Sequence, residues 1–225
     1  ASKENATLIS VCINDTSISV INDGVDMKCS HMTGSIKSVH AAFGMLRTSS
    51  HFDSGNQTIG TNGLGVKLAN IFSTKFEVQL VDSDGEEVTY VWKNNMREMC
   101  CDEAADPELS AGCIKVTMYP DMKTLKCSIQ LSSYIGWVRH RLLEAGTESG
   151  LELIVNGEVV PNVSELDFAR LHCHEDEVVT LCNGVVACML SEPMDSLASC
   201  ISVVNGGRTI EHGIHVDAVR SMIHA

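Results

Sequence analysis

Hydrophobic and polar positions alternate along several short segments of the chain, and turn-forming residues join these segments in pairs. Such alternation places apolar side chains on one face of a β-strand, and a short polar or glycine-containing connection closes a hairpin. The pattern predicts three hairpins, formed by residues 8–13 with 17–21, by residues 76–81 with 88–92, and within residues 150–161. Further strands are predicted at 112–121, 178–182, 185–190 and 200–205.

Apolar positions three and four residues apart predict helices between the strands. Segment 38–46 has one apolar face, made of Val39, Ala42, Phe43 and Leu46. A second helix opens near Leu64, and a third is predicted over residues 133–145.

Length and composition limit the possible functions. The 225 residues can form one full domain and part of a second. Because no apolar segment approaches the roughly 20 residues of a membrane helix, and no signal-peptide pattern opens the chain, we expect a soluble protein of the cell interior. A formal net charge of −13 argues against a broad nucleic-acid-binding face. The ten cysteines, for example Cys12 and Cys127, are interpreted as reduced thiols that act as small hydrophobic residues.

The glycine-rich segment 60–67, followed by the helix that opens near Leu64, is the strongest candidate for a binding site. Glycines let the backbone adopt positive φ and approach a ligand closely. A helix start offers unpaired N–H groups and positive dipole potential, and Lys67 adds an ammonium, so this combination suits a polyphosphate. A tight turn that merely caps an ordinary helix would give a similar segment. No metal-binding residue is predicted, since neither Cys100-Cys101 nor His172-Cys173-His174 has the spacing of a metal site.

Residues 43–53, 60–67 and 69–76, in this order and spacing, closely resemble the ATP-binding region of type II DNA topoisomerases of the eukaryotic and large-virus kind. These enzymes belong to the GHKL ATPase superfamily. The resemblance implies an α+β fold, namely a Bergerat-type (GHKL) α/β sandwich with helices on one face of a mixed sheet. The start of a transducer domain (ribosomal S5 domain 2-like) would follow. The domains would be 1–170, lacking the first helix of the ATP-binding domain, and 171–225.

The same resemblance implies roles for individual residues and two cofactors, ATP and Mg²⁺. Asn22 would read adenine, and Ser49, Ser50 and His51 would contact ribose and phosphate. The residues that would close over the phosphates are Gly60, Thr61, Asn62, Gly63, Leu64, Gly65, Val66 and Lys67. No catalytic residue is assigned, because the general-base glutamate and the magnesium-binding asparagine are expected upstream of residue 1. We therefore expect this segment alone to hydrolyse ATP negligibly.

Two positions in the adenine region depart from the family pattern. Asp26 stands where the family has glycine, and Ile114 stands where related enzymes place a threonine against the adenine. Thr117, three residues on, would face the other side of the strand. Two hypotheses therefore stay open. One is the ATPase segment of an enzyme that relaxes DNA supercoils by duplex strand passage, and the other is a non-catalytic nucleotide-binding or dimerisation module derived from it.

The expected partners follow from the first hypothesis. They are ATP, a second copy of the chain in a homodimer, and duplex DNA contacted through other parts of the full enzyme. No membrane partner is expected. The expected location is the nucleus, or the interior of a virus-infected host cell, and not the secreted space.

Overall fold

The computed structural model describes residues 6–25, 27–46, 63–102, 109–128, 131–146 and 150–170, and the short segments 178–181, 185–188, 203–204, 207–208, 216–218 and 221. The chain divides into two compact units. The first comprises Ala1–Arg139 with Leu151–Val160, and the second comprises His140–Gly150 with Pro161–Ala225. A domain boundary at residue 170 stays a prediction.

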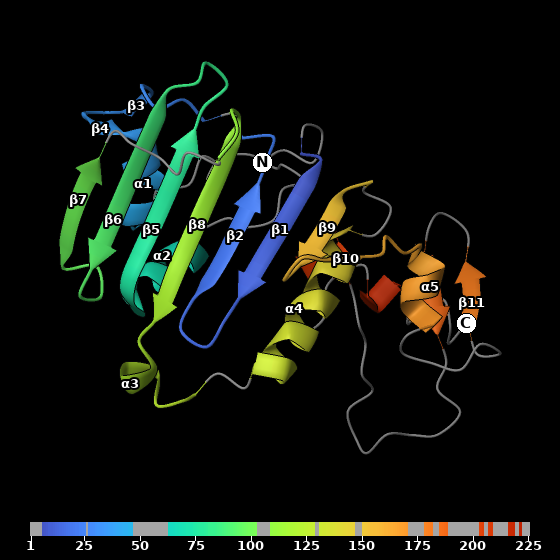
Figure 1. Ribbon diagram of the computed structural model, residues 1–225. Helices are drawn as coiled ribbons and strands as arrows, with labels where there is room; N and C mark the ends of the chain where they lie inside the picture. The colour runs from blue at the N-terminus through green and yellow to red at the C-terminus, as the bar shows by residue number, and fades with distance from the viewer. Residues whose placement is uncertain are drawn as a thin grey trace. The chain divides into compact units, whose positions relative to one another are not determined.

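An eight-stranded sheet forms the framework of the first unit, with the strand order β10-β9-β1-β2-β8-β5-β6-β7 (Figure 1). Its strands are β1 (Leu8–Ile13), β2 (Ile18–Asn22), β5 (Ser73–Val81), β6 (Glu87–Lys93), β7 (Glu98–Asp102), β8 (Cys113–Pro120), β9 (Glu152–Val155) and β10 (Glu158–Val160). Neighbouring strands are antiparallel except for β1 and β9, which run parallel. The sheet is therefore mixed, and all three predicted hairpins are confirmed.

Two short helices pack on one face of this sheet. Figure 1 shows α1 (Ser38–Gly44) and α2 (Gly65–Ile71) behind the strands, where a small hairpin of β3 (Met32–Thr33) and β4 (Ile36–Lys37) precedes α1. Helix α3 (Met122–Leu125) follows β8, and α4 spans Leu131–Gly146. The α+β class and the predicted helices are thus confirmed, although α1 ends at Gly44, two residues before the predicted end.

The core of the first unit lies between α1 and the central strands. Its buried members are Cys29, Val39, Phe76, Val78, Leu80, Val88, Tyr90, Trp92 and Ile114. The alternation of β5 explains the arrangement, because Phe76, Val78 and Leu80 share one face of the strand and are all buried. The cysteines do not all follow the expected pattern. Cys12 and Cys127 are exposed rather than buried hydrophobic residues, since Cys12 faces away from the core and Cys127 follows α3 instead of lying in a strand.

The second unit contains short elements. Helix α5 spans Glu165–Arg170, β11 (Val178–Leu181) pairs antiparallel with β12 (Val185–Cys188), and β13 (Val203–Val204) pairs with β14 (Gly207–Arg208). Strands β11, β12 and β13 fall within the three segments predicted from the sequence, whereas β14 lies outside them. Within the described ranges, no helix is both long and apolar enough to cross a membrane.

Candidate functional site

Asn22 is the last residue of β2 and is half-buried. Its neighbours across the sheet are Ile9 on β1 and Ile114 on β8. The adjacent Asp23 has a structural role, because its Oδ1 accepts hydrogen bonds from the backbone N–H of Thr7 at 2.7 Å and of Leu8 at 2.8 Å. Burial alone would raise the pKa of Asp23, but the hydrogen bonds from Thr7 and Leu8 hold it below its ordinary value. Asp23 thus fixes the start of β1 beside the strand end that carries Asn22.

The turn after Asn22 is tied to the sheet. Gly24 has φ of +70°, a conformation that favours glycine, and Val25 then donates its N–H to the carbonyl of Gly112 at 3.1 Å. Gly112 directly precedes β8. Asp26 lies outside the described residues.

Ile114 belongs to the hydrophobic core, with 7% of its surface exposed. Thr117 occupies the opposite face of β8, where its hydroxyl donates to Ser19 Oγ at 3.4 Å. The expectation that Thr117 cannot replace a threonine at position 114 therefore agrees with the geometry. No hydroxyl stands opposite Asn22 on β8.

The glycine-rich segment is described from Gly63 onward. Gly60, Thr61 and Asn62 lie outside the described residues, as do Ser49, Ser50 and His51. Gly63 has φ of +55°, Leu64 is the N-cap residue, and α2 begins at Gly65. A Cβ placed on Gly65 would meet no atom of the described residues within 4 Å.

Two polar residues of α2 are buried, whereas three apolar residues in the helix and at its caps are exposed. Lys67 and Asn70 are 2% and 0% exposed, whereas Leu64, Leu68 and Phe72 are 40%, 49% and 38% exposed. Burial lowers the pKa of Lys67, because an ammonium loses hydration inside the protein. A surface helix normally shows the reverse pattern, since burying charge is costly. The inward face of α2 therefore carries polar groups suited to a polar ligand beside Val66 and Ala69, which pack against the core.

Several hydrogen bonds hold α2 against its surroundings. Asn70 Nδ2 donates to the carbonyl of Phe43 in α1 at 3.2 Å. At the same C-terminal end of the helix, Asn95 Nδ2 donates to the carbonyl of Ile71 at 3.0 Å, and the N–H of Asp121 donates to the carbonyl of Phe72 at 2.8 Å. The side chain of Asn70 is completely buried, and its Oδ1 has no hydrogen-bond partner among the described residues.

Comparison with known proteins places this geometry in a family. DNA topoisomerase 2 of Invertebrate iridescent virus 6 is 31% identical over 209 residues, which cover 87% of this chain and 18% of the relative. The crystal structure of the ATPase and transducer domains of DNA topoisomerase II from Balamuthia mandrillaris superposes with a TM-score of 0.81 at 28% identity, covering 98% of this chain and 59% of that one. The chain is homologous to the ATPase and transducer region of eukaryotic and viral type II DNA topoisomerases.

Other comparisons agree with this topoisomerase relationship. DNA topoisomerase 2 of Arabidopsis thaliana is 28% identical over 239 residues, covering 98% of this chain and 16% of the relative. The 43K ATPase domain of Thermus thermophilus gyrase B has a TM-score of 0.56 at 18% identity, covers 79% of this chain and 46% of that one, and shows a shared GHKL-type fold. No protein-family model matches the chain. The chain spans less than a fifth of the length of these curated topoisomerases.

A cavity of about 440 Å³ lies at the far ends of β2 and β8 from Asn22 and Ile114. Its lining residues are Ile18, Met118, Pro120, Met122, Leu125, Cys127, Ser128, Ser133, Tyr134 and Trp137. Of the residues that the topoisomerase resemblance assigns to nucleotide binding, those that the structure describes, Asn22 and Gly63 to Lys67, do not line it. The cavity is therefore separate from the described part of the candidate site.

Sequence reasoning missed the residues that anchor α2. The segment Lys93-Asn94-Asn95-Met96 matches topoisomerases, yet the match assigns no role to Asn95. The sequence signal was the pair of adjacent asparagines, because asparagine tolerates positive φ more readily than most residues. Asn94 and Asn95 indeed have φ of 53° and 57°.

Proposed function

We propose that this chain is the ATP-binding segment of an ATP-dependent type II DNA topoisomerase. Asn22 reads the adenine, and Ser49, Ser50 and His51 contact the ribose and phosphates. Residues 60–67 close over the phosphates. The observation that carries this proposal is the buried Lys67 on the inward face of α2, at the end of the glycine-rich segment.

The chemistry of the described residues fits an anionic ligand. The first N–H groups of α2 have no partners within the helix, and their dipoles favour negative charge. The buried Lys67 ammonium adds a full positive charge, and a phosphate would offset the loss of hydration that lowers its pKa. Mg²⁺ would be held mainly through phosphate oxygens and would neutralise part of their charge.

Hydrolysis requires a group that activates water. A positioned general base contributes roughly 10²–10⁴-fold to such reactions, and we assign no described residue to this role. We therefore infer that this segment binds ATP and that the base comes from another part of the enzyme. In the complete enzyme, ATP binding would join two protomers and drive passage of one DNA duplex through another.

A second candidate function is a nucleotide-binding or dimerisation module without catalysis. The observation that favours it is Ile114, an apolar core residue opposite Asn22 in the region proposed for adenine. A glutamate followed four residues later by an asparagine, on a helix upstream of residue 1, would favour the enzyme. Absence of such a pair from the longer gene product would favour the module.

Calorimetric titration with a non-hydrolysable ATP analogue and Mg²⁺ tests the proposal. We expect micromolar binding by the unaltered chain and a roughly tenfold to hundredfold loss in Lys67→Ala, because a hydrogen bond to a charged group is removed. Lys123→Ala is the control, since it removes an equal charge from the exposed surface of α3. Absence of binding by the unaltered chain, or equal binding by Lys67→Ala and Lys123→Ala, would contradict the proposal.

A further inference from the structure

We propose that Asn95, on the turn between β6 and β7, is a positioning residue for the nucleotide site and acts by holding the C-terminal end of α2. This role rests on the function proposed above, because α2 matters to the site through Lys67. The side chain of Asn95 donates hydrogen bonds to Ile71 and Asp121, so it acts on the site through the helix.

The carboxamide of Asn95 bridges two elements. Its Nδ2 donates to the carbonyl of Ile71 at 3.0 Å and to Asp121 Oδ2 at 3.1 Å, and its backbone N–H donates to the carbonyl of Ser73 at 3.1 Å. Ile71 is the last residue of α2. The final carbonyls of a helix have no partner within the helix, so Asn95 supplies a hydrogen bond that α2 cannot make for itself.

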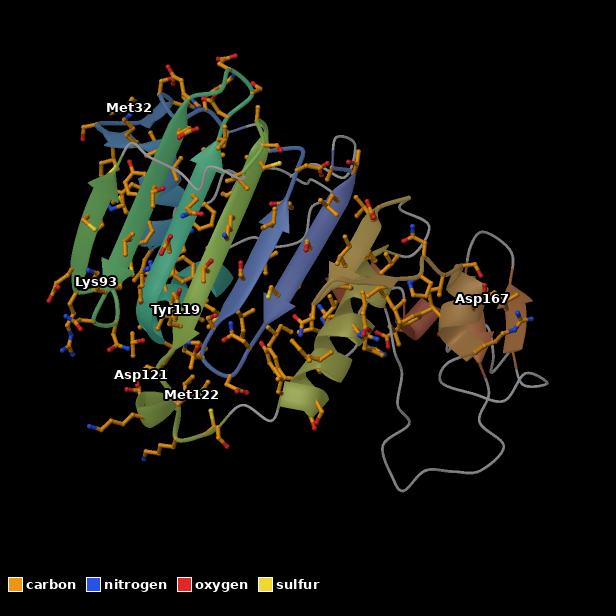
Figure 2. The ribbon with its side chains drawn as sticks, viewed as in Figure 1. Met32, Lys93, Tyr119, Asp121, Met122 and Asp167 are labelled. Atoms are coloured by element: carbon orange, nitrogen blue, oxygen red, sulfur yellow. The ribbon has the colours of Figure 1, made fainter. Side chains whose placement is uncertain are left out.

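Asp121 is a fixed acceptor for this bridge. Its Oδ1 accepts from the N–H of Thr124 at 3.1 Å, and its Oδ2 accepts from the Thr124 hydroxyl at 2.6 Å, which caps α3. The hydrogen bonds from Thr124 and then from Asn95 hold the pKa of Asp121 below its ordinary value, so the carboxylate stays ionised at neutral pH. Figure 2 shows Asp121 at the end of β8, between Tyr119 and Met122.

The anchor matters for Lys67 because α2 is short. A helix of seven residues is not stable by itself in water, and its position depends on tertiary contacts, here the packing of Val66 and Ala69 against the core and the hydrogen bonds at its C-terminal end. Lys67 and Ile71 are four residues apart, which is about one helical turn, so movement at Ile71 displaces Lys67 directly. Among the described residues, the bonds from Asn95 and Asp121 hold the helix at its C-terminal end.

A neighbouring residue provides a matched control. Asn94 and Asn95 both have positive φ, so glycine at either position keeps the backbone conformation and adds a similar entropic cost. The side chains differ, because Asn94 Nδ2 donates to Glu98 Oε1 at 2.6 Å on the exposed surface. Comparison of Asn95→Gly with Asn94→Gly therefore separates the loss of the Asn95 side-chain hydrogen bonds from the effect of glycine on the turn.

Two measurements on the full chain test the role. We expect Asn95→Gly to weaken binding of the non-hydrolysable ATP analogue about tenfold, and to speed hydrogen exchange at the amides of Leu68 and Phe72 by a similar factor. Asn94→Gly should change neither. Equal effects of the two variants on binding, or unchanged exchange in α2 of Asn95→Gly, would overturn the inference.

A charge variant gives a readout that loss of folding alone would not give. Asn95→Asp places a second carboxyl beside Asp121, and two such groups cannot both ionise without repulsion. We expect weak analogue binding at pH 7.5 that recovers at least threefold near pH 5.5, relative to the unaltered chain, as the pair takes up a proton. A pH profile parallel to that of the unaltered chain would contradict the anchor. If the unaltered chain binds no nucleotide, the proposed function is wrong. Hydrogen exchange at the α2 amides of the Asn95→Gly variant then still tests whether Asn95 holds the helix.

Discussion

Asn22 and Ile114 are register partners on the adjacent strands β2 and β8. The polar residue ends its strand half-buried, and the apolar one belongs to the core with 7% of its surface exposed. The candidate base-binding region at Asn22 and the hydrophobic core at Ile114 therefore meet where β2 pairs with β8. Position 114 therefore affects stability and, under the proposed function, also recognition of the base.

Ile114→Thr separates these two effects. We expect it to lower the free energy of unfolding by about 1–3 kcal/mol, because a hydroxyl enters an apolar core. Ile114→Val, the control, should cost about 0.5–1.5 kcal/mol through lost packing alone. If a hydroxyl at this position helps to read adenine, the threonine variant binds the ATP analogue more tightly than the valine variant. Denaturant unfolding and calorimetry measure the two quantities, and equal affinity would exclude position 114 from base recognition.

Much of the sheet could be predicted from the sequence. The hairpins of β1 with β2 and of β5 with β6 have clear alternation and turn residues, and the structure confirms both. Strand β7 was missed because an edge strand paired only with β6 has little need of an apolar face, and its sequence Glu98-Met99-Cys100-Cys101-Asp102 shows no such alternation. Four-residue α3 was missed since it is too short to show helical periodicity.

The candidate site could be predicted only in part. The spacing of Leu64, Leu68 and Phe72 correctly predicts α2, but these residues form its exposed side. The burial of Lys67 and Asn70 has no periodic hydrophobic signal, so the glycine-rich segment and the resemblance to topoisomerases pointed to Lys67 as a ligand residue but not to its burial. The contact between Asn95 and Ile71 joins residues that are 24 positions apart, and such pairings depend on the folded sheet rather than on local sequence.

Gly44, the last residue of α1, allows this helix to lie directly on Trp92. A Cβ at this position would be 2.8 Å from Trp92 Cζ2 and 2.7 Å from His40 Cδ2, well inside contact distance. We expect Gly44→Ala to lower the free energy of unfolding by about 1–3 kcal/mol through overpacking.

Gly136→Ala is the matched control, because a Cβ at this position in α4 would meet no atom of the described residues within 4 Å. That variant should be neutral or more stable by up to about 1 kcal/mol. Thermal unfolding of both variants tests the prediction, and destabilisation by the α4 variant alone would contradict it.

Asp82 makes stability depend on pH. It is 1% exposed, and its carboxylate accepts N–H groups of Cys29 at 3.0 Å, Asp84 at 2.9 Å and Glu86 at 3.1 Å. Burial alone would raise the pKa of Asp82, but these hydrogen bonds outweigh it and hold the pKa below 3.8. A carboxyl with a depressed folded-state pKa stabilises the fold above its unfolded pKa, and this contribution is lost as pH falls through the folded value.

We therefore expect Asp82→Asn to lose about 1–3 kcal/mol of unfolding free energy at pH 7, because an amide nitrogen cannot accept these bonds. Its stability should also fall less between pH 5 and pH 3 than that of the unaltered chain. Asp84→Asn, which alters an exposed carboxyl of the same turn, should change stability by less than about 1 kcal/mol. Urea unfolding across this pH range measures both effects. A pH dependence in Asp82→Asn equal to that of the unaltered chain would show that Asp82 is not its source.

Cys29 should be the least reactive of the described cysteines. Burial, together with the negative charge of Asp82, raises the pKa of its thiol to about 11. Only about one molecule in a thousand would then carry the thiolate at pH 8, and the thiolate is the form that alkylating reagents attack. We expect iodoacetamide to label the exposed residues Cys12 and Cys127 in the folded chain long before Cys29, with the order measured by peptide mass spectrometry. Labelling in denaturant is the control. Unfolding exposes the Cys29 thiol and separates it from Asp82, so Cys29 should then react as fast as Cys12 and Cys127. Equal labelling of Cys29 and Cys12 in the folded chain would mean that the turn holding Asp82 opens on the timescale of the reaction.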